Sequence, residues 1–447
     1  MRRAIWTRLA GVCPPNPPDP AVTNPAPARG LIFAAPASGS GKTTVTLGVL
    51  RALSRQGVPV RGAKSGPDYI DPAFHAAACG RACLNLDAWA MTPASLRARA
   101  SGDGLLLIEG AMGLFDGAPP DGRGATADLA RLLDLPVVLI VDAARMAQSI
   151  APLVAGFAAH DPHVRIAGVI LNRVGSDRHA AMLRRALDPL GLPVLGCIPR
   201  AAALARPSRH LGLVQAQEDP ALDTFLNAAA DVMTAHLDLT SLTALATSLT
   251  AAPPVRVDPP AQRIAVAQDA AFSFVYPHQL AEWQAAGATV TPFSPLADMA
   301  VPAADLILLP GGYPELHAGQ LSAAIQFMQS IRHAAQSTDI YGECGGYMAL
   351  GQTLTDADGT THKMAGLLDL HTSFQTRRLH LGYRNLMAAQ GRMAGSWAGH
   401  EFHYATTLSA TGQPLFTATD AAGTALPDMG LVAGRVAGSF AHLIDRS

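Results

Sequence analysis

Lys42 and Thr43 close a run of small residues that can bind the phosphates of a nucleotide. Gly39 and Gly41 allow the backbone N–H groups of this run to face phosphate oxygens, which a Cβ would obstruct. The Lys42 ammonium can reach the β- and γ-phosphates, and the Thr43 hydroxyl can bind Mg²⁺. The run departs from the common pattern at one position, because Pro36 stands where a first glycine is usual. We predict that ATP binds here, through Gly39, Gly41, Lys42, Thr43 and Thr44.

Carboxylates follow two later apolar segments and could complete this site. Glu109 closes one of these segments, and an acidic residue there, after a phosphate loop, is the usual second anchor for Mg²⁺. Lys64, Asp68 and Asp71 follow the other segment, at a place where ligands bind in parallel α/β sheets. Asp68 and Asp71 could bind Mg²⁺ or orient a substrate, but turn formation explains them equally well. Asp116 is close enough to Glu109 in the sequence to share its site. The predicted metal ligands are Thr43, Glu109 and Asp68.

Cys344 has the surroundings of a nucleophile, because it stands between an apolar segment and a helical one with glycines on both sides. These glycines permit a strained turn that exposes the side chain, and the N-terminus of the following helix favours a thiolate. Gly311 and Gly312 come after a neighbouring apolar segment and can supply the N–H groups of an oxyanion hole. His442 can act as the base that such a thiol needs.

A second group of polar residues, His400, Glu401 and His403, does not have the spacing of a zinc HExxH motif. These side chains could pack in the interior or contact a substrate. The sequence assigns them no metal and leaves both interpretations open.

The predicted site residues require parallel sheets to bring them together. Six apolar segments alternate with helical stretches, which predicts a doubly wound, mostly parallel α/β sheet. Asn172 follows the fifth segment and can hydrogen-bond a purine edge, because its amide offers both a donor and an acceptor. A second alternating series after the first predicts another α/β domain. The predicted strands are 31–35, 58–63, 105–108, 135–141, 164–171 and 192–198, then 263–267, 288–293, 306–309 and one that begins at 339.

Composition divides the chain into four parts. Residues 1–28 contain seven prolines and no periodic pattern, which predicts a disordered extension. We place an ATP-binding domain at 29–219, and a helical segment followed by a proline-rich linker at 220–262. The second α/β domain is expected at 263–447.

Charge and hydropathy exclude several classes of partner. A net charge of −1 gives no electrostatic footprint for nucleic acid or for an anionic membrane. No apolar run approaches the ~18 residues that span a bilayer, and the start lacks the apolar segment of a secretory signal. The five scattered cysteines make no disulfide framework. We therefore expect a cytoplasmic protein that binds neither nucleic acid nor a membrane.

The phosphate loop, the carboxylates at strand ends and the C-terminal Cys/His pair together describe an ATP-dependent glutamine amidotransferase. From about residue 30 to residue 442 the chain resembles the cobyrinic/hydrogenobyrinic acid a,c-diamide synthases of cobalamin biosynthesis. The resemblance implies an N-terminal domain similar to dethiobiotin synthetase and a C-terminal domain similar to triad-type glutamine amidotransferases. The Pro36 form of the loop looks like that of the hydrogenobyrinic acid branch. The segments that carry the resemblance are AAPASGSGKTTVTLG, KSGPDYIDPAFH, NLDAWAM, IEGAMGLFDG, FSPLAD, LPGGYPELHA, ECGGYMALG and GHEFHYA.

The resemblance implies a reaction with two sites. L-Glutamine is hydrolysed at Cys344 through a thioester, with His442 as base, and ammonia passes internally to the ATP site. There ATP phosphorylates the a and c acetate carboxylates of a corrinoid in turn, and ammonia displaces phosphate. Carried over by motif, Lys42, Thr43 and Glu109 hold ATP–Mg²⁺; Lys64, Asp68, Asp71 and Asp116 line the site of the acyl phosphate; Asn172 contacts adenine.

One member of the triad is not assigned by the motif. Many triad amidotransferases carry a Glu two residues after the catalytic His, but Ile444 occupies that position and Asp445 is one residue further on. Two rival interpretations remain. A cobyric acid synthase is disfavoured by KSGPDYIDP and NLDAWAM, and a ParA/MinD-like ATPase switch would carry a second Lys early in the phosphate loop and no cysteine elbow. The sequence leaves open whether cobalt is already in the ring, which carboxylate reacts first, and whether the protein forms a homodimer.

Overall fold

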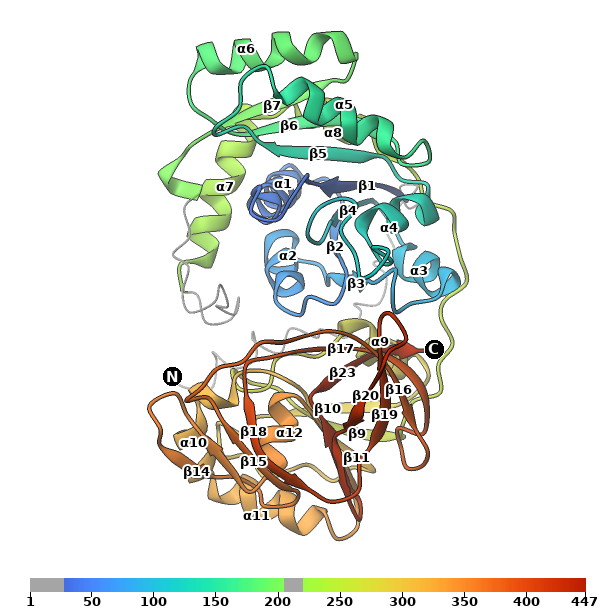
Figure 1. Cartoon of the computed structure of the whole chain (residues 1–447), viewed down its shortest axis with the longest axis vertical. Coiled ribbons are helices and arrows are strands. Elements are labelled where there is room, and N and C mark those ends of the chain that lie inside the picture. Colours follow the sequence, from blue (N-terminus) through green and yellow to red (C-terminus); the bar gives the residue numbers. More distant parts are fainter. Residues whose placement is uncertain (1–27, 205–219) are drawn as a thin grey trace.

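The computed structural model describes residues 28–204 and 220–447. Almost all of the predicted extension, residues 1–28, lies outside the described residues, as does the segment 205–219. Within the described part of the chain, no helix is long and apolar enough to cross a membrane. The chain forms two α/β halves, one above the other in Figure 1.

The N-terminal half is a doubly wound sheet, as predicted. Its strands run in the order β3-β2-β4-β1-β5-β6-β7, each pair being parallel, and a short β8 pairs antiparallel with the start of β1. All six predicted strands are present with shifted bounds, whereas β3 and β8 are not among the predicted strands. The strands are β1 Arg29–Ala34, β2 Val60–Ser65, β3 Leu84–Leu86, β4 Leu105–Glu109, β5 Val137–Asp142, β6 Ile166–Val174, β7 Val194–Pro199 and β8 Thr247–Ser248.

Helices cover both faces of this sheet, which is why its central strands are apolar throughout. Along β1 the side chains alternate, so that Ile32 enters one core layer while Leu31 and Phe33 enter the other. α1, α2, α7 and α8 pack on the second of these faces, and α3 to α6 pack on the first. The helices are α1 Lys42–Arg55, α2 Asp71–Cys79, α3 Pro93–Ala100, α4 Thr126–Leu133, α5 Ile150–His160, α6 Asp177–Leu187, α7 Leu222–His236 and α8 Leu239–Ala244.

The segment 220–262 begins with two helices that belong to the N-terminal half. Its helices α7 and α8 pack on the N-terminal sheet, where Leu226 and Leu242 are fully buried. The proline-rich stretch after β8 then runs down the side of the molecule to the C-terminal half (Figure 1).

The C-terminal half combines a parallel sheet with antiparallel ones. The central sheet has the order β10-β9-β11-β12-β22-β21, and its first four members are the strands predicted for this region. The strands after residue 350 are not among the predicted elements. Apart from β21 and β22 they form two mostly antiparallel sheets, β14-β13-β15-β18 and β20-β19-β16-β17-β23, in which only β13 and β15 pair parallel. The helices are α9 Pro277–Ala285, α10 Ala318–Ala323, α11 Ile325–Ala334 and α12 Gly345–Leu350. The strands are β9 Arg263–Ala267, β10 Thr289–Phe293, β11 Leu306–Leu309, β12 Asp339–Glu343, β13 Thr353–Thr355, β14 Thr361–Lys363, β15 Asp369–Ser373, β16 His380–Ala388, β17 Gly395–His403, β18 Thr406–Thr411, β19 Phe416–Asp420, β20 Ala425–Met429, β21 Leu431–Ala433, β22 Val436–Ser439 and β23 Ala441–Arg446.

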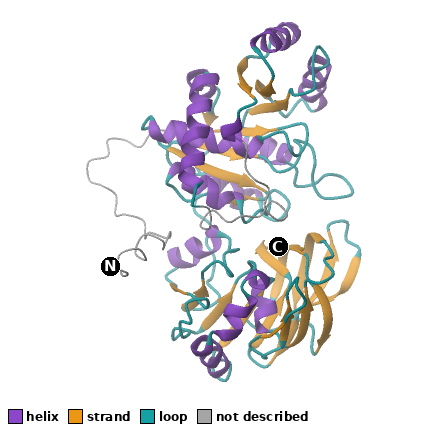
Figure 2. Ribbon diagram, turned by 90° about the vertical axis from the view of Figure 1, so that its left-hand side faces the viewer, coloured by secondary structure: helices purple, strands orange, loops and turns teal. Residues whose placement is uncertain are grey.

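The two halves are stacked on one another in Figure 2. They meet through a buried ion cluster and a shared apolar layer. Arg99 of α3 donates to both carboxylate oxygens of Glu282 in α9, at 2.7 and 2.9 Å, and to Asp445 of β23 at 2.7 Å. Tyr276 and Ile444 of the C-terminal half belong to the same core layer as the N-terminal strands. This docking brings the carboxyl ends of the first sheet towards the C-terminal half.

Candidate active site

The phosphate loop lies between β1 and α1, in the strand–loop–helix context that its chemistry needs. Gly41 precedes α1 with a φ of 91°, a left-handed conformation that suits glycine. A Cβ at Gly41 would lie 2.2 Å from the Asn172 amide nitrogen, so the position is closed to a side chain by space as well. Lys42 begins the helix, and its ammonium donates to the carbonyl of Met112 in the loop after β4.

The predicted magnesium ligands Thr43 and Glu109 are in contact. The Thr43 hydroxyl donates to Glu109 Oε1 at 2.6 Å, because β1 and β4 are neighbours and end at the same edge of the sheet. A hydroxyl and a carboxylate oxygen are hard ligands of the kind that Mg²⁺ prefers, so the residues fit the ion. Asp68 stands apart: in the part of the chain that the structure describes, no hydrogen bond or ion pair joins it to Thr43 or Glu109.

A buried charge network surrounds Glu109. Its Oε1 accepts from Lys64 at 2.8 Å, and its Oε2 is bonded to His75 at 2.6 Å. Burial alone would raise the pKa of Glu109, but Lys64 and His75 outweigh burial and hold this pKa well below its ordinary value. Lys64 also forms an ion pair with Asp71, whose pKa rises to about 6 because burial and Asp68 outweigh Lys64. The site therefore holds two carboxylates and one ammonium close together in a dry environment.

The remaining predicted residues of this site hold their loops in shape. Asp68 Oδ1 accepts from the backbone N–H groups of Ile70 and Asp71, which is the turn chemistry that the sequence left open. Asp116 Oδ2 accepts from Gly113 N at 2.9 Å. Both aspartates also line the cavity described below.

Asn172 lies beneath the phosphate loop, at the end of β6. Its Nδ2 donates to the Ser40 carbonyl at 2.9 Å, and its Oδ1 accepts from Arg173 N at 2.9 Å. The side chain is buried and supports the loop in this conformation. The adenine contact stays a prediction.

Cys344 occupies a strained turn between β12 and α12, as the flanking glycines predict. Its φ of 46° is positive, which is unusual for a residue with a side chain, and it is the conformation of a nucleophile elbow. A Cβ at Gly346 would lie 1.9 Å from the carbonyl oxygen of Leu309, so the helix can approach β11 only with glycine there. The elbow is thus built by close packing of the strand and the helix.

Gly311 lies against both predicted catalytic side chains. A Cβ at Gly311 would lie 2.2 Å from His442 Cε1 and 3.3 Å from Cys344 Cβ. A Cβ at Gly312 would lie 2.1 Å from the carbonyl oxygen of Ala271. The structure therefore brings Cys344, His442 and the loop of Gly311 and Gly312 together, the arrangement that thiol catalysis with an oxyanion hole requires.

Glu343 is not among the predicted site residues, yet it is the carboxylate nearest to His442. Its Oε2 lies 3.6 Å from His442 Nδ1, longer than a hydrogen bond, while its Oε1 accepts from Leu443 N at 3.2 Å. Asp445 faces elsewhere, because it pairs with Arg99. The available signal was an acidic residue directly before the cysteine, at the end of an apolar strand.

Burial sets the protonation of this pair. It raises the pKa of the Cys344 thiol above its ordinary value, and the Gly345 N–H lowers that pKa by less. Burial also lowers the pKa of His442 to about 3, with His400 and His403 adding to the effect. The helix N-terminus therefore does not produce a resting thiolate, contrary to the expectation from sequence, because desolvation is the larger effect. The resting pair is a neutral thiol and a neutral imidazole.

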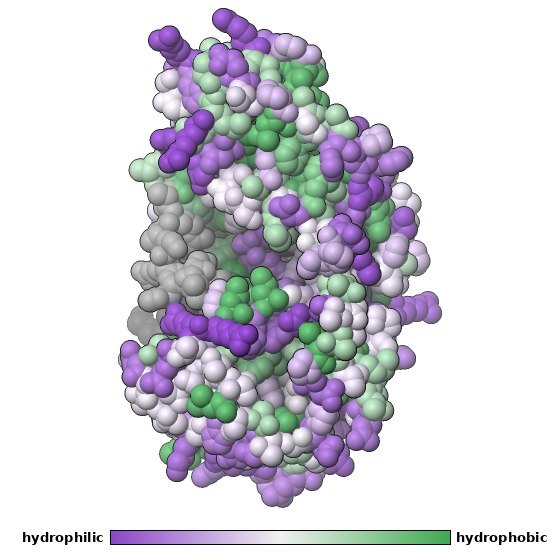
Figure 3. All heavy atoms as spheres, in the orientation of Figure 1, coloured by the Kyte–Doolittle hydropathy of each residue, from purple (hydrophilic) through white to green (hydrophobic). Residues whose placement is uncertain are grey.

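One cavity of about 690 Å³ extends from Cys344 to Asp68 and Asp116, two residues of the predicted acyl-phosphate site. It is lined by Asp68, Tyr69 and Asp116 from the N-terminal half and by Cys344 and Glu315 from the C-terminal half. The face of the molecule is hollowed between the two halves (Figure 3). Groups for thiol chemistry and groups beside the phosphate loop thus face the same space.

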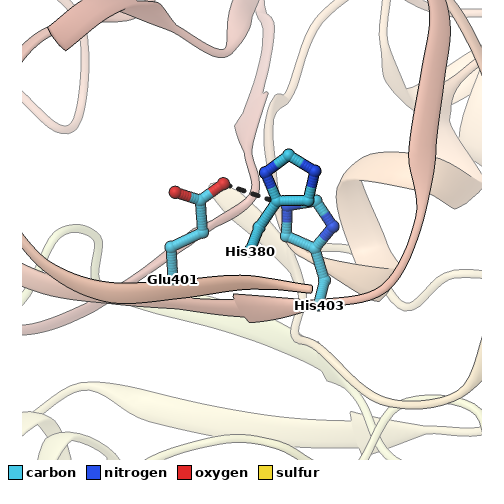
Figure 4. Close-up of side chains that lie close together, drawn as sticks. All are labelled: His380, Glu401 and His403. Carbon is cyan, nitrogen blue, oxygen red and sulfur yellow. Dashed lines mark hydrogen bonds and ion pairs between the residues drawn. The ribbon is translucent and has the colours of Figure 1, made fainter. Parts of the chain in front are cut away.

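His380, Glu401 and His403 come together on β16 and β17, where His380 pairs directly with His403 across the strands (Figure 4). The two imidazole rings stack at 4.6 Å, and His403 Nε2 is bonded to Glu401 Oε1 at 2.9 Å. The other carboxylate oxygen accepts from Arg384 at 2.9 and 2.7 Å. Because an arginine occupies the carboxylate, the group is a neutralised ion-pair network at the edge of the cavity.

Comparison with known proteins identifies the two halves. Residues 31–214 match the family described as the CobQ/CobB/MinD/ParA nucleotide binding domain, and residues 263–447 match the CobB/CobQ-like glutamine amidotransferase domain. The protein is therefore an amidating enzyme with a nucleotide-binding domain and a glutamine amidotransferase domain.

Similar proteins cover nearly the whole chain. A hydrogenobyrinate a,c-diamide synthase of Rhodobacter capsulatus is 54% identical over 93% of this chain and 98% of its own. The enzymes of that name from Brucella suis and Rhizobium meliloti are 54% and 53% identical over 94% of this chain and 99% and 100% of theirs. The chain belongs to the hydrogenobyrinate a,c-diamide synthase family.

Proposed function

We propose that this protein is a carbon–nitrogen ligase that uses ATP and L-glutamine to amidate the a and c acetate carboxylates of hydrogenobyrinic acid. The observation that carries the proposal is the single cavity lined by Cys344 and by Asp68 and Asp116 of the N-terminal half. The names of the relatives supply the acceptor, since each acts on hydrogenobyrinate.

Glutamine is hydrolysed in the C-terminal half. His442 takes the proton of Cys344 as sulfur attacks the side-chain amide, and then delivers it to the leaving ammonia, which leaves a thioester on Cys344. Water then attacks this thioester, glutamate leaves, and the sulfur regains its proton. Backbone N–H groups of Gly311 and Gly312 stabilise the oxyanion, and Glu343 lies on the Nδ1 side of His442, at 3.6 Å. Since the resting thiol is neutral, proton transfer to His442 accompanies the attack.

The carboxylate is activated in the N-terminal half. A carboxylate resists attack by an amine until one of its oxygens becomes a leaving group, which the γ-phosphate of ATP provides. Lys42 binds the phosphates, and Thr43 and Glu109 hold Mg²⁺, which supplies charge neutralisation to the phosphates when bound. Lys64, Asp68, Asp71 and Asp116 position the acceptor carboxylate, and Asp71 is suited to accept a proton from the incoming ammonia because its pKa is about 6.

Ammonia reaches the acyl phosphate through the shared cavity. Cys344 and Asp68 line the same space, so an acceptor bound in this space would keep ammonia released at the sulfur out of bulk water. Ammonia that escaped to solvent would be protonated to ammonium, which is not a nucleophile.

The rivals explain less of the structure. A ParA/MinD-like switch would have no use for a cysteine elbow packed against Gly311 and His442. A cobyric acid synthase would have the same two kinds of site, but the relatives that cover the whole chain carry the diamide synthase name.

The experiment compares nitrogen sources and acceptors. We expect Cys344→Ala to abolish amidation with glutamine and to retain amidation with ammonium salts, while the parent converts hydrogenobyrinic acid to a diamide faster than cobyrinic acid. Product mass and phosphate release measure both. Equal loss with both nitrogen sources, or no diamide from either acid despite ATP hydrolysis, would overturn the proposal.

A further inference from the structure

An aromatic side chain of the N-terminal half touches the base of the C-terminal half. The ring of Tyr69 lies over the ring of His442, with the centroids 4.3 Å apart and a tilt of 33°. Phe274 stacks on Tyr69 at 5.5 Å, and Tyr276 lies at 5.0 Å, so both neighbours hold the ring in place. Tyr69 belongs to the loop between β2 and α2, which carries Asp68 and ends at Asp71, the first residue of α2.

This loop is fixed to the N-terminal half by several bonds. Asn85 Nδ2 donates to the carbonyls of Gly66 and Asp68, at 2.9 and 2.7 Å. Asp71, two residues after Tyr69, pairs with Lys64, which in turn donates to Glu109. The position of the Tyr69 ring is therefore set by the same network that surrounds the nucleotide site.

We propose that Tyr69 is a positioning residue of the glutaminase site, which holds the His442 imidazole in place and keeps water from it. The inference rests on the proposed roles of Cys344 and His442. Through this contact the glutaminase is complete only when the loop of the N-terminal half is seated on it.

The surroundings of His442 show what the ring contributes. Glu343 faces its Nδ1 from β12, Cys344 lies beside it at the start of α12, and His400 and His403 approach it from β17. Neither ring nitrogen of His442 has a hydrogen-bond partner among the described residues. Without bonds at its nitrogens, the imidazole depends on packing for its orientation, and Tyr69 supplies the face contact.

The test measures each nitrogen source separately in the full-length protein. Tyr69→Phe keeps the ring and is expected to retain glutamine hydrolysis. Tyr69→Leu removes the ring and is expected to lower kcat for glutamine by about tenfold or more, since small misplacements of a catalytic group are costly. The KM for glutamine is expected to stay near the parental value. Because Tyr69 also lines the cavity that takes the acceptor, amidation with ammonium salts is expected to slow, but by clearly less than glutamine hydrolysis.

The pH dependence of glutamine hydrolysis is a second measurement, and a general loss of structure would not shift its apparent pKa. Burial lowers the pKa of His442 to about 3, so loss of the Tyr69 ring, which admits water, should move the acid limb of kcat/KM for glutamine hydrolysis towards the ordinary value of 6.5. Trp89→Leu is the matched control. It removes the other ring that stacks across the two halves, 4.3 Å from Tyr383, without touching His442, and should leave the acid limb unmoved.

Each outcome decides the matter. Equal losses with glutamine and ammonia in Tyr69→Leu would place the residue with the acceptor and overturn the proposal, as would unchanged hydrolysis with an unchanged pH profile. Tyr69→Met repeats the test with a flexible, unbranched side chain that adapts to the vacated space, should the leucine variant melt early. Retention of glutamine-dependent activity in Cys344→Ala would instead refute the proposed function itself, whatever Tyr69→Leu shows.

Discussion

Glu109→Gln is the most informative single change, because it removes one charge and keeps the shape of the side chain. Glu109 is fully buried and bonds Thr43 and Lys64 through Oε1 and His75 through Oε2. A glutamine oxygen can still accept from Thr43 and Lys64, and its NH₂ group then faces His75. The variant should therefore fold, with the His75 ring nitrogen accepting from the new NH₂ group.

The loss of stability in Glu109→Gln can be worked out from the hydrogen bonds of Glu109 that would no longer involve a charged carboxylate. Hydrogen bonds to charged groups contribute about 1.5–3 kcal/mol each, and Lys64 keeps Asp71 as a second partner. We expect the free energy of unfolding to fall by about 2–4 kcal/mol. We also expect at least about a hundredfold slower amidation with glutamine and ammonia alike, because weaker neutralisation of the phosphates by about 3 kcal/mol corresponds to that factor.

The assay follows product with both nitrogen sources, beside chemical denaturation. Glu282→Gln is the matched control, since it makes the same chemical change in a buried ion pair, that of Arg99, far from the phosphate loop. The control should lose stability but keep its dependence on Mg²⁺ and ATP. Amidation by Glu109→Gln within a few-fold of the parent would refute the assignment of Glu109 to the metal.

Three further changes test other parts of the structure. Arg99→Ala leaves the carboxylates of Glu282 and Asp445 without their partner between the two halves, and should cost about 3–5 kcal/mol in the free energy of unfolding, measured by denaturant titration. Gly41→Ala should cost about 1–2 kcal/mol from its φ alone and should weaken ATP binding in calorimetry; normal affinity would contradict the described loop. Burial raises the pKa of Glu343 to about 8, so the parent loses stability as the pH rises from 4.5 to about 8, and Glu343→Gln, which stays neutral, should gain stability relative to the parent over that interval; a constant difference would exclude this shift.

The parallel strands were predictable because each is a short apolar run that ends at a chemically distinct residue. Glu109 closes β4 and Cys344 follows β12, and such strand ends gather at one edge of a parallel sheet. The antiparallel strands after residue 350 escaped prediction for a physical reason. Strands such as β18 and β20 are largely exposed, so they lack the apolar runs that marked the central strands.

The partners of the site residues could not be read from the sequence, because they come from distant elements. Glu343 contacts His442 only because β12 and β22 are paired, which places β23 beside the elbow. Tyr69 meets His442 across the two halves. The protonation of Cys344 also escaped prediction, since local helix geometry is visible in a sequence whereas the depth of burial is not.

Because one cavity serves both sites, the bound acceptor itself helps to retain ammonia in the protein. Cys344 and Asp68 line one chamber and do not lie at the two ends of a tunnel. Only the molecule bound in this chamber can therefore separate the released ammonia from solvent. A corrinoid acid bound in the chamber would block the exit of ammonia to solvent. Acceptors with the right carboxylates but a smaller frame should then be amidated at a lower yield per glutamine, so the size of the corrinoid, as well as its acetate groups, decides how tightly hydrolysis and amidation stay matched.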